Sequence, residues 1–186
     1  MNGEKNFISF LNSCLMFWLR LTEMVFITLH LKTKVFLIIQ SVCMLMGAST
    51  HIVWVFNNGF LSEKYNASFF SALFWDSLTF LDPIAAFLLI LKPKKGLYLV
   101  LAIMLLDIIH NNIFYLEELY FSSISITDWI KKYWMIGMQM IFGVFVISTF
   151  KSNLTNVKKA EMLKWNATSH LYRLSDSVLI RKGEFY

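Results

Sequence analysis

The chain has 186 residues, of which 57% are hydrophobic, 17% are aromatic and only 16% are charged. Soluble domains are about 45–50% apolar and about 25% charged, so this composition excludes an ordinary soluble domain and indicates a polytopic membrane protein. The net charge of +5 comes without a basic stripe interleaved with aromatic residues, and nucleic acid is therefore not expected as a partner. Cys14 and Cys43 lie in apolar stretches without metal-ligand spacing, so neither a disulfide nor a zinc–cysteine site is expected.

The first predicted element is an apolar helix within residues 1–31, in the stretch FISFLNSCLMFWLRLTEMVFITLHL. Arg20 and Glu23 interrupt it, and a charge at mid-bilayer costs about 2.5–3.5 kcal/mol. Their three-residue spacing allows an ion pair on one helix face. We expect either an amphipathic helix that lies in the membrane interface or a fifth transmembrane helix, and we favour the interface.

Four longer apolar segments follow, close to the length of about 20 residues that a spanning helix needs. They are residues 35–56, 69–91, 96–116 and 133–150. Because the chain contains only two prolines and seven glycines, little of it is available for loops or linkers. The sequence predicts an all-α, polytopic four-helix bundle over residues 32–150, followed by a basic tail over 151–186 that lies on anionic lipid.

The charges between these segments predict the orientation in the membrane. If the four helices alternate, one side receives most of the lysines, including those of a short turn, KPKK, between the second and third segments. These are Lys32, Lys34, Lys92, Lys94, Lys95, Lys151, Lys158 and Lys159. The other side receives Glu63, Lys64, Glu117, Glu118 and Asp128, and only Lys131 and Lys132 run against the pattern. Since cytoplasmic loops hold an excess of lysine and arginine, both ends of the four-span unit are predicted to face the cytoplasm.

Ionisable side chains interrupt the apolar segments at similar depths. Four of them fall roughly 6–11 Å below the outer surface at a rise of 1.5 Å per residue. They are His51, Asp76, Asp107 and His110, while Asp82 lies deeper. Such groups normally face the bundle interior, where they pair or contact water. We predict a polar pocket near the outer leaflet or, alternatively, Asp107–His51 or Asp76–His110 hydrogen bonds that lock two spans together.

Acid–base chemistry fits such a pocket best, because a carboxyl group buried in hydrocarbon can exchange protons near neutral pH. Asp76 and Asp107 are the predicted proton carriers, oriented by His51 and His110. The predicted substrate-binding residues surround them: Trp75, Thr79, Asp82, Asn111 and Asn112. No H-x-x-x-H or H-E-x-x-H spacing supports a metal, and a b-type haem between the two histidines is a weaker alternative, so no cofactor is expected.

The stretch WDSLTFLDPIAAFLLILKPKKGLYLVLAIMLLDIIHNNIFYL resembles in layout the EXPERA family, which includes a sterol isomerase (the emopamil-binding protein) and four-span relatives that bind sterols and sigma ligands. The resemblance implies a four-span fold and a sterol-like ligand, with Asp76 in place of the family's catalytic Glu and Pro83 at its proline. GASTHIVWVFNNGF is similar to the family's Gly-x-x-x-His stretch, which gives His51 a family polar position. The sequence departs from the family pattern at Val55, in place of an acid, and at Gln139 in the last span.

Three classes of function follow from these residues. The first is a protein that binds or isomerises a lipid- or isoprenoid-like molecule by carboxylate proton transfer, with membrane lipid and a hydrophobic small molecule as partners. The second is a membrane accessory or immunity subunit that contacts another membrane protein. The third is a small proton-coupled transporter, which would require a homodimer.

Overall fold

The structure, a computed structural model, describes residues 25–121 and 124–183. The predicted N-terminal helix, with Cys14, Arg20 and Glu23, lies outside the described residues except at its end. The described helices are α2 (Leu31–Asn58), the short 3₁₀-helix η1 (Glu63–Tyr65), α3 (Phe69–Leu91), α4 (Pro93–Phe121), α5 (Ile126–Lys132) and α6 (Trp134–Gly183).

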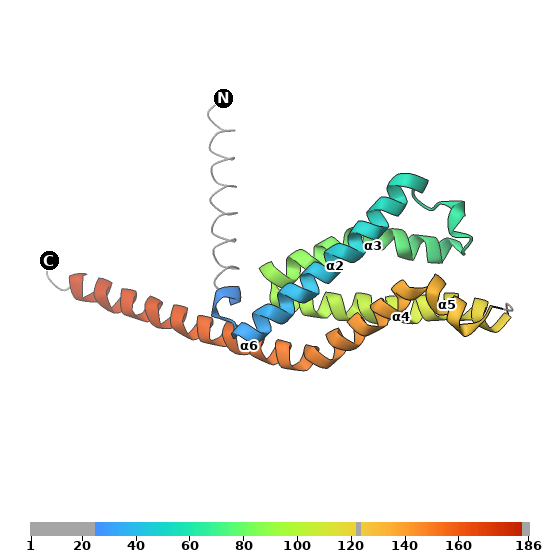
Figure 1. Ribbon diagram of the computed structural model, residues 1–186. Helices are drawn as coiled ribbons and strands as arrows, with labels where there is room; N and C mark the ends of the chain where they lie inside the picture. The colour runs from blue at the N-terminus through green and yellow to red at the C-terminus, as the bar shows by residue number, and fades with distance from the viewer. Residues whose placement is uncertain (1–24, 122–123, 184–186) are drawn as a thin grey trace, which may run out of the picture.

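Among the described residues, four helices are long and apolar enough to cross a membrane: α2, α3, the part Pro93–Tyr115 of α4 and the part Trp134–Asn166 of α6. They pack as a bundle and run in alternating directions, with the α2–α3 connection and α5 at one end and the α3–α4 turn at the other (Figure 1). The protein is an all-α, multi-pass membrane protein, as the sequence predicts. The cytoplasmic location of the lysine-rich end stays a prediction.

The turn between α3 and α4 is shorter than the predicted KPKK turn. Lys92 alone joins the two helices, and Pro93 is the first residue of α4, a position that suits proline because its fixed φ is helical and no N–H is needed there. Gly96 makes the close approach possible, because a Cβ at this position would overlap the backbone of Leu88 and Leu89. The two antiparallel helices therefore meet backbone to backbone at this end.

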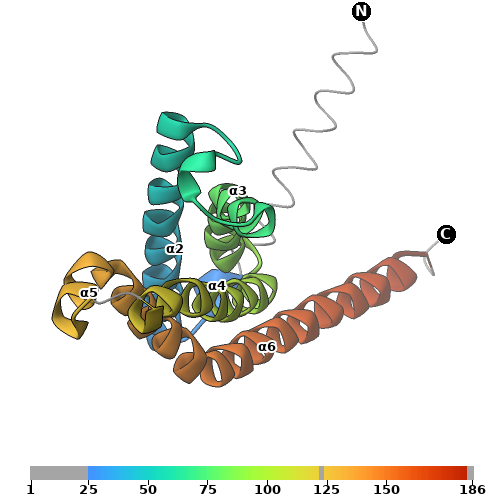
Figure 2. The same cartoon turned by 90° about the vertical axis from the view of Figure 1, so that its right-hand side faces the viewer.

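Helix α6 is 50 residues long and passes without a break through the predicted boundary at residue 150. Just beyond that boundary it packs against the start of α2, where Nδ2 of Asn156 donates to Oγ1 of Thr33 at 2.9 Å. Its last part then leaves the bundle, as two perpendicular views show (Figures 1 and 2). The described part of the predicted basic tail is thus a helical continuation of the fourth span.

Replacement of Gly96 tests the close α3–α4 contact. Gly96→Ala should destabilise the protein by roughly 1–3 kcal/mol, because the added methyl group overpacks against backbone that cannot yield. Gly137→Ala is the matched control in α6, where a Cβ meets nothing within 4 Å, and it should stabilise by about 0.5–1 kcal/mol through helix propensity. Unfolding midpoints in detergent measure both changes. Equal effects of the two substitutions would contradict the contact.

Candidate functional site

Asp76 holds the α2–α3 connection on the end of the bundle. Its side chain is 1% exposed, and its Oδ2 accepts from the backbone N–H of Leu61 at 2.5 Å while Oδ1 accepts from the hydroxyl of Tyr65 at 2.6 Å. The Tyr65 ring lies between Trp54 and Trp75, with centroid distances of 4.9 and 5.2 Å. Burial, and then the hydrogen bond to Asp76, raise the pKa of Tyr65, so the phenol remains a donor.

The connection that Asp76 holds contains unfavourable backbone conformations. Leu61 has a φ of 52° and Asn66 a φ of 47°, in the left-handed region where a residue other than glycine costs of order 1–3 kcal/mol. Leu61, whose backbone N–H donates to Asp76, is one of these two residues. Lys64 adds a further tie, because its Nζ donates to Oδ1 of Asn58 at 3.1 Å. Asp76 therefore has a structural use for both of its oxygens.

Asp82 and Asp107 form a second acidic group deeper in the bundle. Asp82 lies six residues, or about 9 Å, along α3 from Asp76. Both side chains are 5% exposed, and the two carboxyl groups are close enough for their charges to interact. Oδ1 of Asp82 has no hydrogen-bond partner within residues 25–121 and 124–183. Its Oδ2 lies against Gly47 of α2, where a Cβ would be only 3.0 Å away.

Asn111 connects Asp107 to two neighbouring helices. Its Oδ1 accepts from the indole N–H of Trp75 at 2.8 Å, and its Nδ2 donates both to Oδ1 of Asp107 and to Oε1 of Gln139 at 2.9 Å. Trp75 belongs to α3 and Gln139 to α6, so a single amide ties three spans together. Trp75 and Asn111 were predicted as substrate contacts. The structure shows that their polar atoms bond to other side chains.

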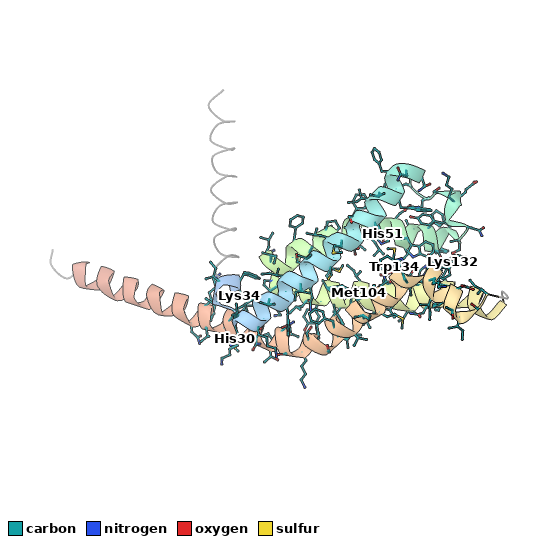
Figure 3. All side chains as sticks on the ribbon, viewed as in Figure 1. His30, Lys34, His51, Met104, Lys132 and Trp134 are labelled. Atoms are coloured by element: carbon teal, nitrogen blue, oxygen red, sulfur yellow. The ribbon has the colours of Figure 1, made fainter. Side chains whose placement is uncertain are left out.

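The two histidines do not bond to the predicted carboxylates. His51 lies in the half of α2 nearer the α2–α3 connection (Figure 3), where its charge would interact with that of Asp76 although no hydrogen bond joins them. His110 packs its ring against Phe74 and Trp75, at centroid distances of 4.8 and 5.3 Å, and its Nε2 has no partner. The predicted Asp107–His51 and Asp76–His110 hydrogen bonds are therefore wrong: Oδ1 of Asp107 accepts from Asn111 instead, and both oxygens of Asp76 accept from the α2–α3 connection.

Two predicted substrate-binding residues have different surroundings. Asn112 donates from Nδ2 to the carbonyl of Ile108 at 2.7 Å, within its own helix, so it does not join the group around Asp107. Thr79 lies one turn before Asp82 on α3, and its buried Oγ1 has no hydrogen-bond partner. Thr79 therefore places this hydroxyl group about one helical turn from Asp82.

Two residues that matter were not among the predicted site residues. Gln139 departs from the family pattern, and an amide in an apolar span is itself a signal of an interior partner. Tyr65 lies in a polar connection, where nothing in the sequence indicates contact with Asp76. Only the return of the connection over the bundle end brings the two together.

Metal ligation has no visible site in residues 25–121 and 124–183. No three histidine, cysteine, aspartate or glutamate side chains of these residues gather in a group that would hold an ion. Cys43 has a free thiol.

Comparison with known proteins gives no relative for this chain. No protein-family model matches it, and neither do curated proteins or solved structures. Function is accordingly inferred from the arrangement of the buried polar groups.

Replacement of Tyr65 tests the anchoring of the connection. Tyr65→Phe removes the donor to Asp76 and leaves a buried acceptor unpaired, at a cost of about 1–3 kcal/mol. Hydrogen–deuterium exchange of peptides that cover residues 59–68 should therefore become faster. Tyr98→Phe is the matched control, because Tyr98 is 48% exposed and packs on Phe150 through its ring. Unchanged exchange in Tyr65→Phe would show that Asp76 does not hold the connection.

Proposed function

We propose that this multi-pass membrane protein binds a lipid- or isoprenoid-like molecule within the bilayer and exchanges protons with it through Asp82 and Asp107. The observation that carries the proposal is the buried acidic pair itself. Neither carboxyl group forms an ion pair with a described cation, and no described residue bonds to Oδ1 of Asp82. A buried charge without partner or function is too costly to be a usual feature of a spanning helix.

The pair suits the movement of a carbon–carbon double bond. Two buried carboxyl groups whose charges interact favour a state in which one of them is protonated, because ionising both in a medium of low dielectric constant is costly. The protonated group can then deliver its proton to one carbon of the double bond while the ionised group removes a proton from the adjacent allylic carbon. The double bond shifts by one position, and no net proton is consumed.

The layout similar to that of the EXPERA proteins is our reason to name an unsaturated, sterol- or isoprenoid-like molecule as the substrate class. That resemblance would assign catalysis to Asp76. Both oxygens of Asp76 accept hydrogen bonds from the α2–α3 connection, so we assign it the anchoring role and move proton transfer to Asp82 and Asp107. Thr79 lies one turn from Asp82, and its hydroxyl, which has no partner among the described residues, is our candidate to bind a substrate hydroxyl.

A proton-coupled transporter is the second candidate, because further buried polar side chains lie between α2 and α6 toward the lysine-rich end. Nε2 of Gln40 donates to Oγ1 of Thr149 at 3.1 Å, and Oε1 of Gln40 remains without a partner. Asn153, 1% exposed, also has an unpartnered Nδ2. These uncharged groups would offer hydrogen-bond partners along the path of a proton that moves through the bundle.

Neutralisation of the pair tests the proposed function. Membranes that contain the wild-type protein, Asp82→Asn or Asp107→Asn are compared by untargeted lipid mass spectrometry for the ratio of double-bond isomers. Each variant should lower the rate of interconversion, measured as the change of this ratio with time, by about 10²–10⁴-fold, the usual effect of the loss of a general acid or base. Asp128→Asn is the control, since Asp128 is exposed and its Oδ1 lies 3.9 Å from Nζ of Lys131, outside the acidic pair.

Isomer ratios that are the same with and without the wild-type protein would overturn the isomerase proposal. Proton uptake into proteoliposomes that depends on Asp82, without any change in lipid, would favour the transporter. A stoichiometric protein partner that copurifies equally with wild type and with both variants would favour the accessory subunit.

A further inference from the structure

The surroundings of Asp82 and Asp107 differ in hydrogen-bond donors, and this difference assigns them separate roles. Resting on the proposed function, we propose that Asn111 is a positioning residue that holds Asp107 ionised as the proton acceptor and leaves the shared proton on Asp82. Two observations support this assignment: the fixed orientation of the Asn111 amide and the absence of a hydrogen-bond partner at Oδ1 of Asp82.

Trp75 fixes the orientation of the Asn111 amide. An indole N–H can only donate, so the atom of Asn111 that lies 2.8 Å from Nε1 of Trp75 must be the amide oxygen. The amide nitrogen then faces Asp107 and Gln139, both at 2.9 Å. Gln139 accepts through Oε1, which occupies the second N–H of the amide. The remaining N–H therefore points at Oδ1 of Asp107.

A donor held in this way favours the ionised form of a carboxyl group, because the hydrogen bond to a carboxylate is stronger than that to a neutral acid. Asp82 has no such donor among the described residues: Oδ1 is unpartnered, and Oδ2 lies against Gly47. A carboxyl group buried in that way costs less when it is neutral. Among the other titratable groups of these spans, His51, Asp76, His110 and Tyr115 lie nearer the α2–α3 connection. Cys43 lies on α2 one turn before Gly47, and Tyr98 lies nearer the α3–α4 turn.

The assignment gives the reaction a direction within the pair. Asp82 delivers its proton to the substrate, and Asp107 removes one from it. After a turnover the proton resides on Asp107, and its return to the neighbouring Asp82 restores the resting state. Asn111 touches no substrate in this scheme. It acts through Asp107 alone.

Infrared spectroscopy of the full-length protein in lipid nanodiscs at neutral pH tests the assignment without any substrate. The carbonyl stretch of a protonated carboxyl group should disappear in Asp82→Asn and persist in Asp107→Asn. In the double variant Asp82→Asn/Asn111→Leu the band should reappear, because Asp107 has lost its donor and takes up the proton. Asp82→Asn/Asn112→Leu is the matched control, since Asn112 bonds only to its own helix, and its band should stay absent.

A band that disappears in Asp107→Asn rather than Asp82→Asn would overturn the assignment, as would its absence from the Asn111 double variant when that protein folds. Asn111→Ser, which is polar but too short to bridge, replaces Asn111→Leu if the latter fails to insert. The infrared result and the lipid result are independent. If the infrared bands behave as expected but the lipid isomers do not change, the isomerase proposal is rejected while the assignment of the proton to Asp82 is retained.

Discussion

A polar group inside a spanning helix has no water to bond with, so its partners must come from the protein itself. Asn111 meets this constraint fully: its amide bonds to Trp75, Asp107 and Gln139, and in doing so it sets the relative rotation of α3, α4 and α6. Most of the buried hydroxyl and amide groups of the bundle are paired in a similar way. The few that are not, above all Oδ1 of Asp82, stand out because an unpaired buried polar atom calls for a specific explanation.

Asp76 and Asp82 show how context separates two identical side chains of one helix. Both are buried, and they are less than two turns apart. The carboxylate nearer the helix start meets a backbone N–H and a phenol from the α2–α3 connection, whereas the deeper one meets Gly47 and the charge of Asp107. The Asp76 carboxylate thus has a structural role, because it anchors the α2–α3 connection. Asp82 retains an oxygen without a hydrogen-bond partner among the described residues.

Close approach of the helices rests on glycine at several crossings. Gly96 allows the α3–α4 turn, Gly47 brings α2 over Asp82, and a Cβ at Gly143 of α6 would collide with the side chain of Ile108. In lipid the association of helices depends on such packing and on interhelical hydrogen bonds, because burial from water supplies no driving force between them. Small residues at the helix contacts therefore stabilise the packing of the polar interior as much as its hydrogen bonds do.

Hydropathy and helix geometry were sufficient to predict the four spans, the exact limits of α3 at residues 69–91, and the greater depth of Asp82 compared with Asp76. These properties depend only on the local order of residues along one helix, which a fixed rise per residue translates into position. The partners of each polar group were beyond such reasoning, since they depend on how four helices rotate against one another and where a connecting segment returns. That is why a cluster predicted around His51, Asp76, Asp107 and His110 is divided in the tertiary structure, with Tyr65 and Leu61 on one carboxylate and Asn111 on another.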